Sequence, residues 1–166
     1  MRLLWTLVVE DDFESIAALR NATAGVLTAA HGRGPWSGHC TARGVRADLR
    51  DAKVFVGRAR GRTLVTFRLA SRKPWAIDRA YFTPVKHPLY LTNMAVAPEV
   101  QRQGLGPLAL DRARRLAVEW PADAIVLDAF DHPAAGAGGF YSRCGFRETG
   151  RVTYRGTPLV YFELLL

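Results

Sequence analysis

Apolar and polar residues follow one another along this chain with two different periods, and the changes between them predict the order of its elements. Short apolar or β-rich runs predict strands over residues 3–9, 89–96, 125–128, 147–154 and 159–166. Two further β-rich runs lie on either side of Arg60-Gly61, in "KVFVGRARGRTLVTFRLAS", and predict an antiparallel hairpin.

Four stretches have the spacing or composition of helices. One apolar stripe predicts a first helix, and another predicts a long helix from Leu105. The first stripe consists of Phe13, Ile16, Ala17, Ala24 and Leu27, and the second of Leu105, Ala109, Ala113, Leu116, Ala117 and Trp120. Residues 41–50 suit a short helix, and the small residues of 134–144 suit a last one that ends at Gly145. The order β-α-α-β-β-β-α-β-α-β-β predicts an α/β domain, a mixed sheet of about seven strands with helices on both faces.

Length and composition limit the organisation of the chain. With 166 residues, of which 49% are hydrophobic, it suits a single domain that spans residues 1–166. No apolar run has the length of a membrane helix. The first apolar run meets Glu10 too early for a signal peptide, so it is interpreted as a strand and the protein is expected to be cytoplasmic, with no membrane partner.

The charge of the chain points to an anionic partner of modest size. The net charge is +8, and arginine supplies 20 of the 23 basic residues. Because these arginines are scattered from Arg2 to Arg155, a solvated surface with one site for a small anionic ligand explains them at least as well as nucleic acid does, and a nucleic-acid partner is not expected. The two cysteines and four histidines show neither a disulfide framework nor metal-ligand spacing, so no metal is expected. A homodimer stays open.

A glycine-rich turn stands between the strand that ends at Val96 and the helix that follows. In "QRQGLG", Gly104 and Gly106 leave the first amides of the helix free of side chains. Those amides and the positive end of the helix dipole form an anion site, to which Gln101 and Arg102 add a donor and a charge. The turn is therefore expected to bind a phosphate.

Other interpretations of this turn have to be weighed. Gly104-Leu105-Gly106-Pro107-Leu108-Ala109 satisfies the dinucleotide pattern G-x-G-x-x-G/A, and Asp128 ends the next predicted strand. That fold needs several successive β-α-β units, whereas hairpin-like strands precede this turn. A Walker loop would need Gly-Lys-Ser/Thr, which is absent. A tight turn with no ligand is the plain structural alternative.

A second motif, "GGFYSRCGF" at residues 138–146, decides between these interpretations. Together the two motifs resemble the GNAT superfamily of N-acetyltransferases, whose members carry Val-x-Pro-x-x-Gln/Arg-x-x-Gly-x-Gly/Ala and then Phe/Leu-Tyr-x-x-x-Gly-Phe. The matching residues are Val96, Pro98, Gln101, Gly104 and Gly106, followed by Phe140, Tyr141, Gly145 and Phe146. The resemblance implies the acyl-CoA N-acyltransferase fold, acetyl-CoA as cosubstrate and acetyl transfer to a primary amine.

The resemblance also implies a role for each matching position. The cofactor-binding residues would be Met94, Ala95, Val96, Gln101, Arg102, Gln103, Gly104, Leu105 and Gly106. The amides from Arg102 to Gly106 would hold the diphosphate, and the pantetheine arm would pair with Met94–Val96 where a bulge splays that strand from the next. A backbone N–H near Val96 would bind the oxyanion, and Tyr141 would be the catalytic proton donor for the leaving thiolate. At Tyr141 a packing role is the alternative.

The chain departs from the family pattern at three places. Pro107 removes one amide, and Ala134 stands where many members have Asn. The strand "LYLTNMAV" contains no acidic residue, which leaves Asp128, Asp131, His132 or a chain of waters as the base. The amine is expected to enter over a pocket lined by Trp36, His39, Trp75, Asp78 and Tyr81. A small-molecule amine is the preferred acceptor, and a protein acceptor or a non-catalytic CoA-binding module is the alternative.

Overall fold

The computed structural model describes residues 1–166 and confirms the predicted order of helices and strands. The strands are Leu4–Leu7 (β1), Ala52–Ala59 (β2), Arg62–Ala70 (β3), Pro88–Val96 (β4), Ala124–Phe130 (β5), Arg147–Tyr154 (β6) and Thr157–Leu165 (β7). The α-helices are Phe13–His31 (α1), Ala42–Asp48 (α2), Leu105–Glu119 (α3) and Gly138–Arg143 (α4). Short 3-10 turns cover Glu10–Asp12 (η1), Arg79–Tyr81 (η2) and Pro98–Val100 (η3). None of the helices combines the length and the apolar composition that a membrane span requires.

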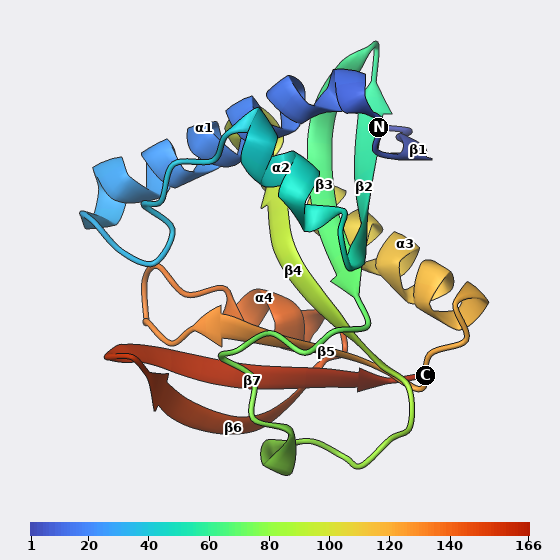
Figure 1. The fold of residues 1–166 in the computed structure, drawn as a ribbon. Coiled ribbons are helices and arrows are strands. Elements are labelled where there is room, and N and C mark those ends of the chain that lie inside the picture. Colours follow the sequence, from blue (N-terminus) through green and yellow to red (C-terminus); the bar gives the residue numbers. More distant parts are fainter.

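All seven strands form one sheet in the order β1-β2-β3-β4-β5-β7-β6. Only β4 and β5 are parallel, and every other neighbouring pair is antiparallel. Helices α1 and α2 cover one face of the sheet, while α3 and α4 lie on the other (Figure 1). A single parallel pair excludes the dinucleotide-binding fold, which is built from successive parallel β-α-β units.

The sheet opens between its two parallel strands. β4 pairs with β5 over only three positions, from Pro88↔Ala124 to Tyr90↔Val126, and the strands then diverge (Figure 1). On its other side β4 contains a bulge, because Thr92 pairs with Arg68 and Ala95 pairs with Thr66. Two residues of β4 thus oppose one residue of β3, and such an insertion bends the strand that carries it. The predicted bulge and the predicted opening are both present.

The hydrophobic core holds the two halves of the sheet together. The largest cluster joins α3 to β3, β4 and β5, with fully buried side chains such as Phe67, Leu105 and Ile125. A smaller cluster joins α1 and α2 to β2 through Ile16 and Val45. Because α3 packs on β3 and β4, the turn that precedes this helix is held in a fixed place at the end of β4.

The predicted helix over residues 134–144 is shorter in the structure, where α4 begins at Gly138. A tight turn occupies the missing part: the Gly136 N–H donates to the His132 carbonyl, and the Nδ1 atom of His132 accepts from the amides of Ala134 and Ala135. These bonds compete with the backbone bonds of a helix, and Pro133 cannot donate one. The small residues of this segment therefore form a turn.

The long connection between β3 and β4 is fixed to the sheet by a buried carboxylate. Glu163 on β7 is only 2% exposed, and it accepts hydrogen bonds from the Thr83 N–H at 2.9 Å and the Thr83 hydroxyl at 2.7 Å. The Arg147 guanidinium also donates to it. Burial opposes ionisation of Glu163, but the bonds from Thr83 and Arg147 outweigh it and lower the pKa.

We expect Glu163→Ala to lower the free energy of unfolding by about 2 kcal/mol at pH 7, because charge-assisted hydrogen bonds are lost. Since the carboxylate has a lowered pKa in the folded protein, its contribution is present above the unfolded-state pKa of about 4.3 and is lost as the pH falls through the folded pKa. Urea unfolding of wild type and variant at pH 7 and pH 3 measures this. An equal difference at both pH values would contradict it.

Candidate active site

The turn between η3 and α3 has an unusual backbone. Arg102 has a φ of 61° and Gly104 a φ of 83°, so two residues of the turn adopt the left-handed conformation. A residue other than glycine seldom adopts it, and such residues concentrate at functional sites. Left-handed residues alternating with ordinary ones turn successive N–H groups toward one side, which creates a concave anion site.

The amides of this turn are left without partners inside the protein. The Gln101 N–H donates to Pro98 and the Leu108 N–H donates to Gly104, whereas the five consecutive N–H groups from Arg102 to Gly106 meet no acceptor. Unpaired backbone donors are rare unless water or a ligand binds them. Pro107, the third residue of α3, lies within the first turn of the helix, where an N–H is commonly unpaired. Its proline ring thus interrupts no helical bond.

A cavity of about 410 Å³ lies between this turn, the end of β4 and α4, and we call it the turn cavity. Its lining includes the predicted residues Met94, Ala95, Val96, Gln101, Arg102, Gly104, Gly106 and Tyr141. The structure adds Thr23, Pro107, Ala137, Phe140 and Arg143, which the sequence did not indicate as cofactor-binding positions. The glycine turn and the motif at residues 138–146, which are far apart in the sequence, thus line one cavity.

Two predicted residues contribute only their backbone to this region. The Gln103 side chain turns back and donates to the Glu99 carbonyl at 3.3 Å, and Leu105 is buried in the core. Ala134, at which the resemblance would place Asn, is absent from the lining of the turn cavity. The side chains of Gln103 and Leu105 are therefore structural, while their N–H groups belong to the unpaired set.

The edge of β4 presents a free donor to the opening of the sheet. The Ala97 N–H donates to Leu64, so the facing residues Val96 and Val65 form a non-hydrogen-bonded pair. In such a pair the N–H and C=O groups of Val96 point away from β3, toward the gap beside β5. The carbonyl is held by the Gln101 side-chain amide at 3.0 Å and lies 3.3 Å from the Thr23 hydroxyl. The Gln101 side chain thus stabilises the strand end.

Tyr141 comes to the turn cavity from α4, with its ring packed against Phe140, Phe146 and Phe162. Burial, together with the nearby charges of Asp128 and Cys144, raises the pKa of Tyr141 to about 12. The phenol consequently stays protonated at neutral pH and can donate a proton. No hydrogen bond within the protein contributes to the pKa of this hydroxyl group.

The three candidate bases differ in their surroundings. Asp131 forms an ion pair with Arg151 at 3.1 Å, and His132 uses Nδ1 to hold the turn before α4. Asp128 has no ion pair, and burial raises its pKa above the usual value for a carboxyl group. It lies on β5 where this strand has left β4, on the same face as Val126 and close enough to affect Tyr141. Of the three, Asp128 has the surroundings of a proton acceptor.

A second cavity of about 490 Å³ lies between α1, α2 and the bulge of β4, and we call it the helix cavity. It shares Thr23, Met94 and Ala95 with the turn cavity, so the two spaces meet at β4. Its other lining residues are Arg20, Ala24, Leu27, Pro35, Trp36, Gly38, His39, Cys40, Thr41, Gly44, Asp48 and Asn93. A small molecule here would lie next to anything bound in the turn cavity.

The structure does not bring the five residues of the predicted acceptor pocket together. Trp36 and His39 line the helix cavity, but Trp75, Asp78 and Tyr81 do not. Trp75 is 82% exposed, and Asp78 accepts the Ala80 N–H in η2. Tyr81 packs edge-on against Tyr161 at 5.5 Å. These three residues belong to the connection that covers the β5–β7 half of the sheet, whereas the helix cavity lies over β4.

The turn cavity continues into a basic hollow of about 690 Å³. Arg102, Gly104, Pro107, Phe140 and Arg143 line both spaces, and Arg114 from α3 lines the second. Asp111 is the one acidic residue of the lining. Three arginines against one aspartate make this hollow attractive to anions. That Arg114 and Arg143 meet Arg102 could not be predicted from the sequence, because the three arginines come from separate segments.

Comparisons with known proteins agree with this geometry. Residues 28–146 match the family described as acetyltransferase (GNAT) family. No curated protein matches the chain. Among solved structures, an acetyltransferase of the GNAT family from Listeria monocytogenes 4b F2365 is 20% identical, with a TM-score of 0.74 and coverage of 98% of this chain and 95% of that chain.

Two further structures share the fold at low identity. One is yncA from Salmonella typhimurium, solved with its cofactor acetyl-CoA, with 17% identity, a TM-score of 0.71 and coverage of 100% and 95% of the two chains. The other is the ribosomal-protein-S18-alanine N-acetyltransferase from Escherichia coli, with 15% identity, a TM-score of 0.70 and coverage of 98% and 93%. Both span the whole sheet and its helices.

Proposed function

Because this chain belongs to the acetyltransferase (GNAT) family, we propose that it transfers the acetyl group of acetyl-CoA to a primary amine on a small molecule. The five unpaired amides from Arg102 to Gly106, placed beside the free edge of β4, are the observation that carries this proposal. They offer a diphosphate several hydrogen bonds at once, next to a strand edge that a pantetheine arm can extend.

The proposed binding mode uses the two spaces that meet at the turn. The diphosphate binds the turn amides, and the basic hollow with Arg102, Arg114 and Arg143 receives the remaining phosphate-bearing end of acetyl-CoA. Arginine is well suited to this because its planar guanidinium pairs with phosphate oxygens. The acyl end then points along β4 toward Val96 and Tyr141.

The proposed reaction is direct attack within a ternary complex. The amine nitrogen attacks the thioester carbon, and the Val96 N–H stabilises the negative charge that develops on the carbonyl oxygen. As the carbon–sulfur bond breaks, the thiolate takes the proton of the Tyr141 hydroxyl, and the amine gives its proton to Asp128. Asp128 then releases its proton to solvent, and the Tyr141 phenolate takes one up, which restores both groups. The products are the acetylated amine and free CoA. Water molecules can link Asp128 to the amine, since this carboxylate lies on β5 and the helix cavity lies over β4.

We expect Asp128→Asn to lower kcat/KM about tenfold. In wild type kcat/KM should fall as the pH is lowered, because the base must be ionised to accept a proton, and the variant should lose this pH dependence. In wild type that decline is expected above the ordinary carboxyl range, since the pKa of Asp128 is raised. A pH profile of kcat/KM from 5 to 9 measures both effects.

The same substitution is expected to stabilise the protein. A raised folded-state pKa means that ionised Asp128 costs stability above this pKa, while at lower pH the protonated group costs nothing. The variant should therefore melt at a higher temperature than wild type at pH 8 and at an equal temperature near pH 4. A lower melting temperature at pH 8 would show a structural role and argue against Asp128 as the base.

The size of the helix cavity favours a small acceptor. At about 490 Å³ it lies in the range of small-molecule sites, which is about 300–1,000 Å³. A peptide acceptor is the alternative, and the Escherichia coli structure with this fold is named for a ribosomal-protein substrate. A CoA-binding module without catalysis is the other alternative.

Release of the CoA thiol from acetyl-CoA tests the proposal. A panel of small amines and a panel of peptides with free N-termini are compared, and mass spectrometry identifies the acetylated product. Thiol release that depends on a small amine supports the proposal, and release that depends only on peptides reassigns the acceptor. Binding of acetyl-CoA without thiol release from any panel would favour the non-catalytic module.

A further inference from the structure

A polar network converges on the bulge of β4. The bulged residues are Asn93 and Met94, which together face Phe67 of β3. Asn93 has a φ of 52°, the left-handed conformation that side chains other than glycine seldom adopt. This strained residue lines the helix cavity and lies three positions before Val96.

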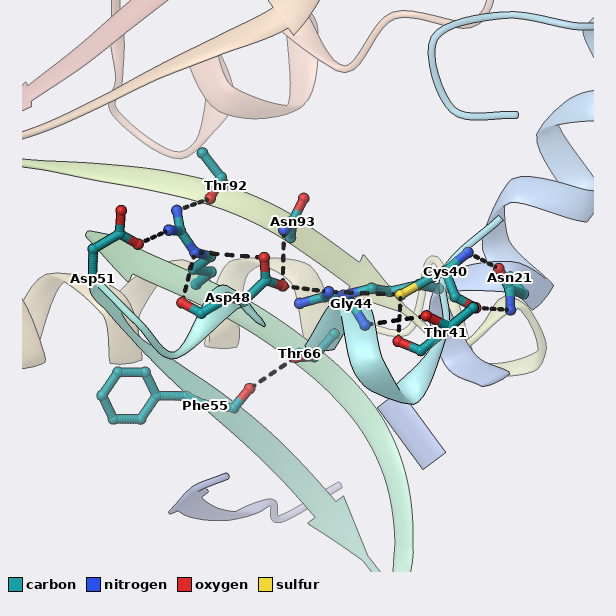
Figure 2. Close-up of polar contacts among 12 residues, drawn as sticks. Asn21, Cys40, Thr41, Gly44, Asp48, Asp51, Phe55, Thr66, Thr92 and Asn93 are labelled. Atoms are coloured by element: carbon teal, nitrogen blue, oxygen red, sulfur yellow. Dashed lines mark hydrogen bonds and ion pairs between the residues drawn. The ribbon is translucent and has the colours of Figure 1, made fainter. Parts of the chain in front are cut away.

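The side chain of Asp48, the last residue of α2, holds Asn93 in place. The Oδ2 atom of Asp48 accepts a hydrogen bond from the Asn93 side-chain amide at 3.2 Å and another from the Arg20 guanidinium at 2.7 Å. Arg20 comes from α1, and its side chain is only 12% exposed. One carboxylate thus ties both helices of this face to the bulge. Figure 2 shows Asp48 beside Asn93.

Arg68 holds the residue beside Asn93 from the other strand. Its guanidinium donates to the Thr92 hydroxyl at 3.2 Å, to the Asp48 backbone carbonyl at 3.3 Å and to the Asp51 carboxylate at 2.6 Å (Figure 2). Asp51 therefore belongs to the same network without touching Asn93. Two aspartates three residues apart differ in whether they contact the left-handed residue.

We infer that Asp48 is a positioning residue that keeps the β4 bulge in the conformation needed for acetyl-CoA binding and acetyl transfer. Burying charged side chains costs free energy. The ion pair of Arg20 and Asp48 is nevertheless partly buried, at the place where α1, α2, β3 and β4 meet at the bulge. Without the bond from Asp48, Asn93 is free to relax toward an ordinary strand conformation. Relaxation of Asn93 removes the bulge and narrows the gap between β4 and β5. It also changes the direction of the N–H and C=O groups of Val96.

The inference rests on the proposed function, since it assigns a purpose to the open strand edge. It goes further in naming a residue outside the acetyl-CoA cavity that sets the affinity for acetyl-CoA. Asp48 lines the helix cavity and is absent from the lining of the turn cavity. An effect of Asp48 on acetyl-CoA affinity therefore passes through β4, or through α1, whose Arg20 contacts Asp48 and whose Thr23 lines the turn cavity. Substitution at Asn93 distinguishes the two routes.

The test measures the dissociation constant of acetyl-CoA by calorimetry for single variants of the full chain. Asp48→Ala is expected to raise this constant about tenfold, as the loss of a charge-assisted hydrogen bond predicts. Asp51→Ala is the matched control, because it removes a carboxylate of the same network that Arg68 contacts but Asn93 does not. The control is expected to stay within about twofold of wild type.

The Asp48→Ala/Asn93→Gly double variant separates positioning from general stability. Glycine adopts a positive φ without strain, so the bulge no longer needs the bond from Asp48. We expect the double variant to recover the dissociation constant to within about threefold of wild type. A structural role alone would not be rescued by glycine at this position. If Asp48→Ala does not fold, Asp48→Asn is measured with the same second substitution.

Unchanged affinity in Asp48→Ala, or weak binding that Asn93→Gly does not restore, would overturn the inference. The calorimetric comparison of the Asp48 variants can be interpreted even if the proposed acetyl transfer is wrong. If wild type binds acetyl-CoA but acetylates no amine, the proposed catalysis fails while the calorimetric comparison still decides the role of Asp48. If wild type does not bind acetyl-CoA, both fail together.

Discussion

The Gly104→Val variant is expected to bind acetyl-CoA about 100-fold more weakly than wild type, which corresponds to losing about 3 kcal/mol, or two charge-assisted hydrogen bonds. Gly104 has a φ of 83°, which a β-branched residue does not readily adopt. The substitution either changes the direction of the turn amides or places a side chain over them. Calorimetry with acetyl-CoA measures the loss.

Gly61→Val is the matched control for this variant. Gly61 has a φ of 74° in the β2–β3 hairpin, and a Cβ atom at either glycine would meet nothing within 4 Å. Both variants therefore carry similar backbone strain and should lose similar melting temperature, but only Gly104→Val should lose affinity. Equal affinity of the two variants would contradict the assignment of the diphosphate to the turn.

The Tyr141→Phe variant is expected to lower kcat about 100-fold, within the range that general acids contribute. The phenol supplies the proton for the departing thiolate, and phenylalanine cannot replace it. Because the pKa of Tyr141 is raised to about 12, the hydroxyl stays protonated up to pH 10, and no alkaline decline of kcat is expected from it. Steady-state kinetics from pH 6 to pH 10 measures both properties.

Two further measurements distinguish a catalytic role for Tyr141 from a packing role. No hydrogen bond within the protein contributes to the pKa of the hydroxyl, so its removal should leave the melting temperature and the acetyl-CoA dissociation constant nearly unchanged. A variant with full turnover, or one that loses stability in proportion to its turnover, would remove Tyr141 from the proposed reaction.

The parts of the structure that could be predicted from the sequence depend on local patterns. Gly104 and Gly106 between a strand and a helix stripe specify the turn, because left-handed backbone and free helix amides are local properties. The number of residues between this turn and Tyr141 then follows from the elements between them, which are α3 and the single crossover strand β5 before α4. The hairpin at Arg60-Gly61 was equally local, and both of its strands are confirmed.

The position of the connection over residues 71–87 could not be predicted, because its packing depends on distant partners. Tyr81 packs against Tyr161, which lies on β7, and Glu163 on the same strand holds Thr83. Nothing in the spacing of Trp75 and Tyr81 distinguishes this half of the sheet from the half under α1. Long-range contacts of this kind place a loop without leaving a periodic pattern.

The network at the bulge was missed for a related reason. Arg20, Asp48 and Asn93 are ordinary polar residues of three separate elements, and the sequence gives no sign that they converge. A bulge also leaves no pattern in a strand whose residues are mostly apolar. Asn93 is the one local sign, since asparagine tolerates positive φ better than other side chains.

A crystal structure of the complex with acetyl-CoA is the decisive test of where the diphosphate binds. We expect the diphosphate oxygens to lie within hydrogen-bond distance of the N–H groups between Arg102 and Gly106, with the thioester between Val96 and Tyr141. A diphosphate bound at another surface, or a pantetheine arm outside the gap between β4 and β5, would contradict it.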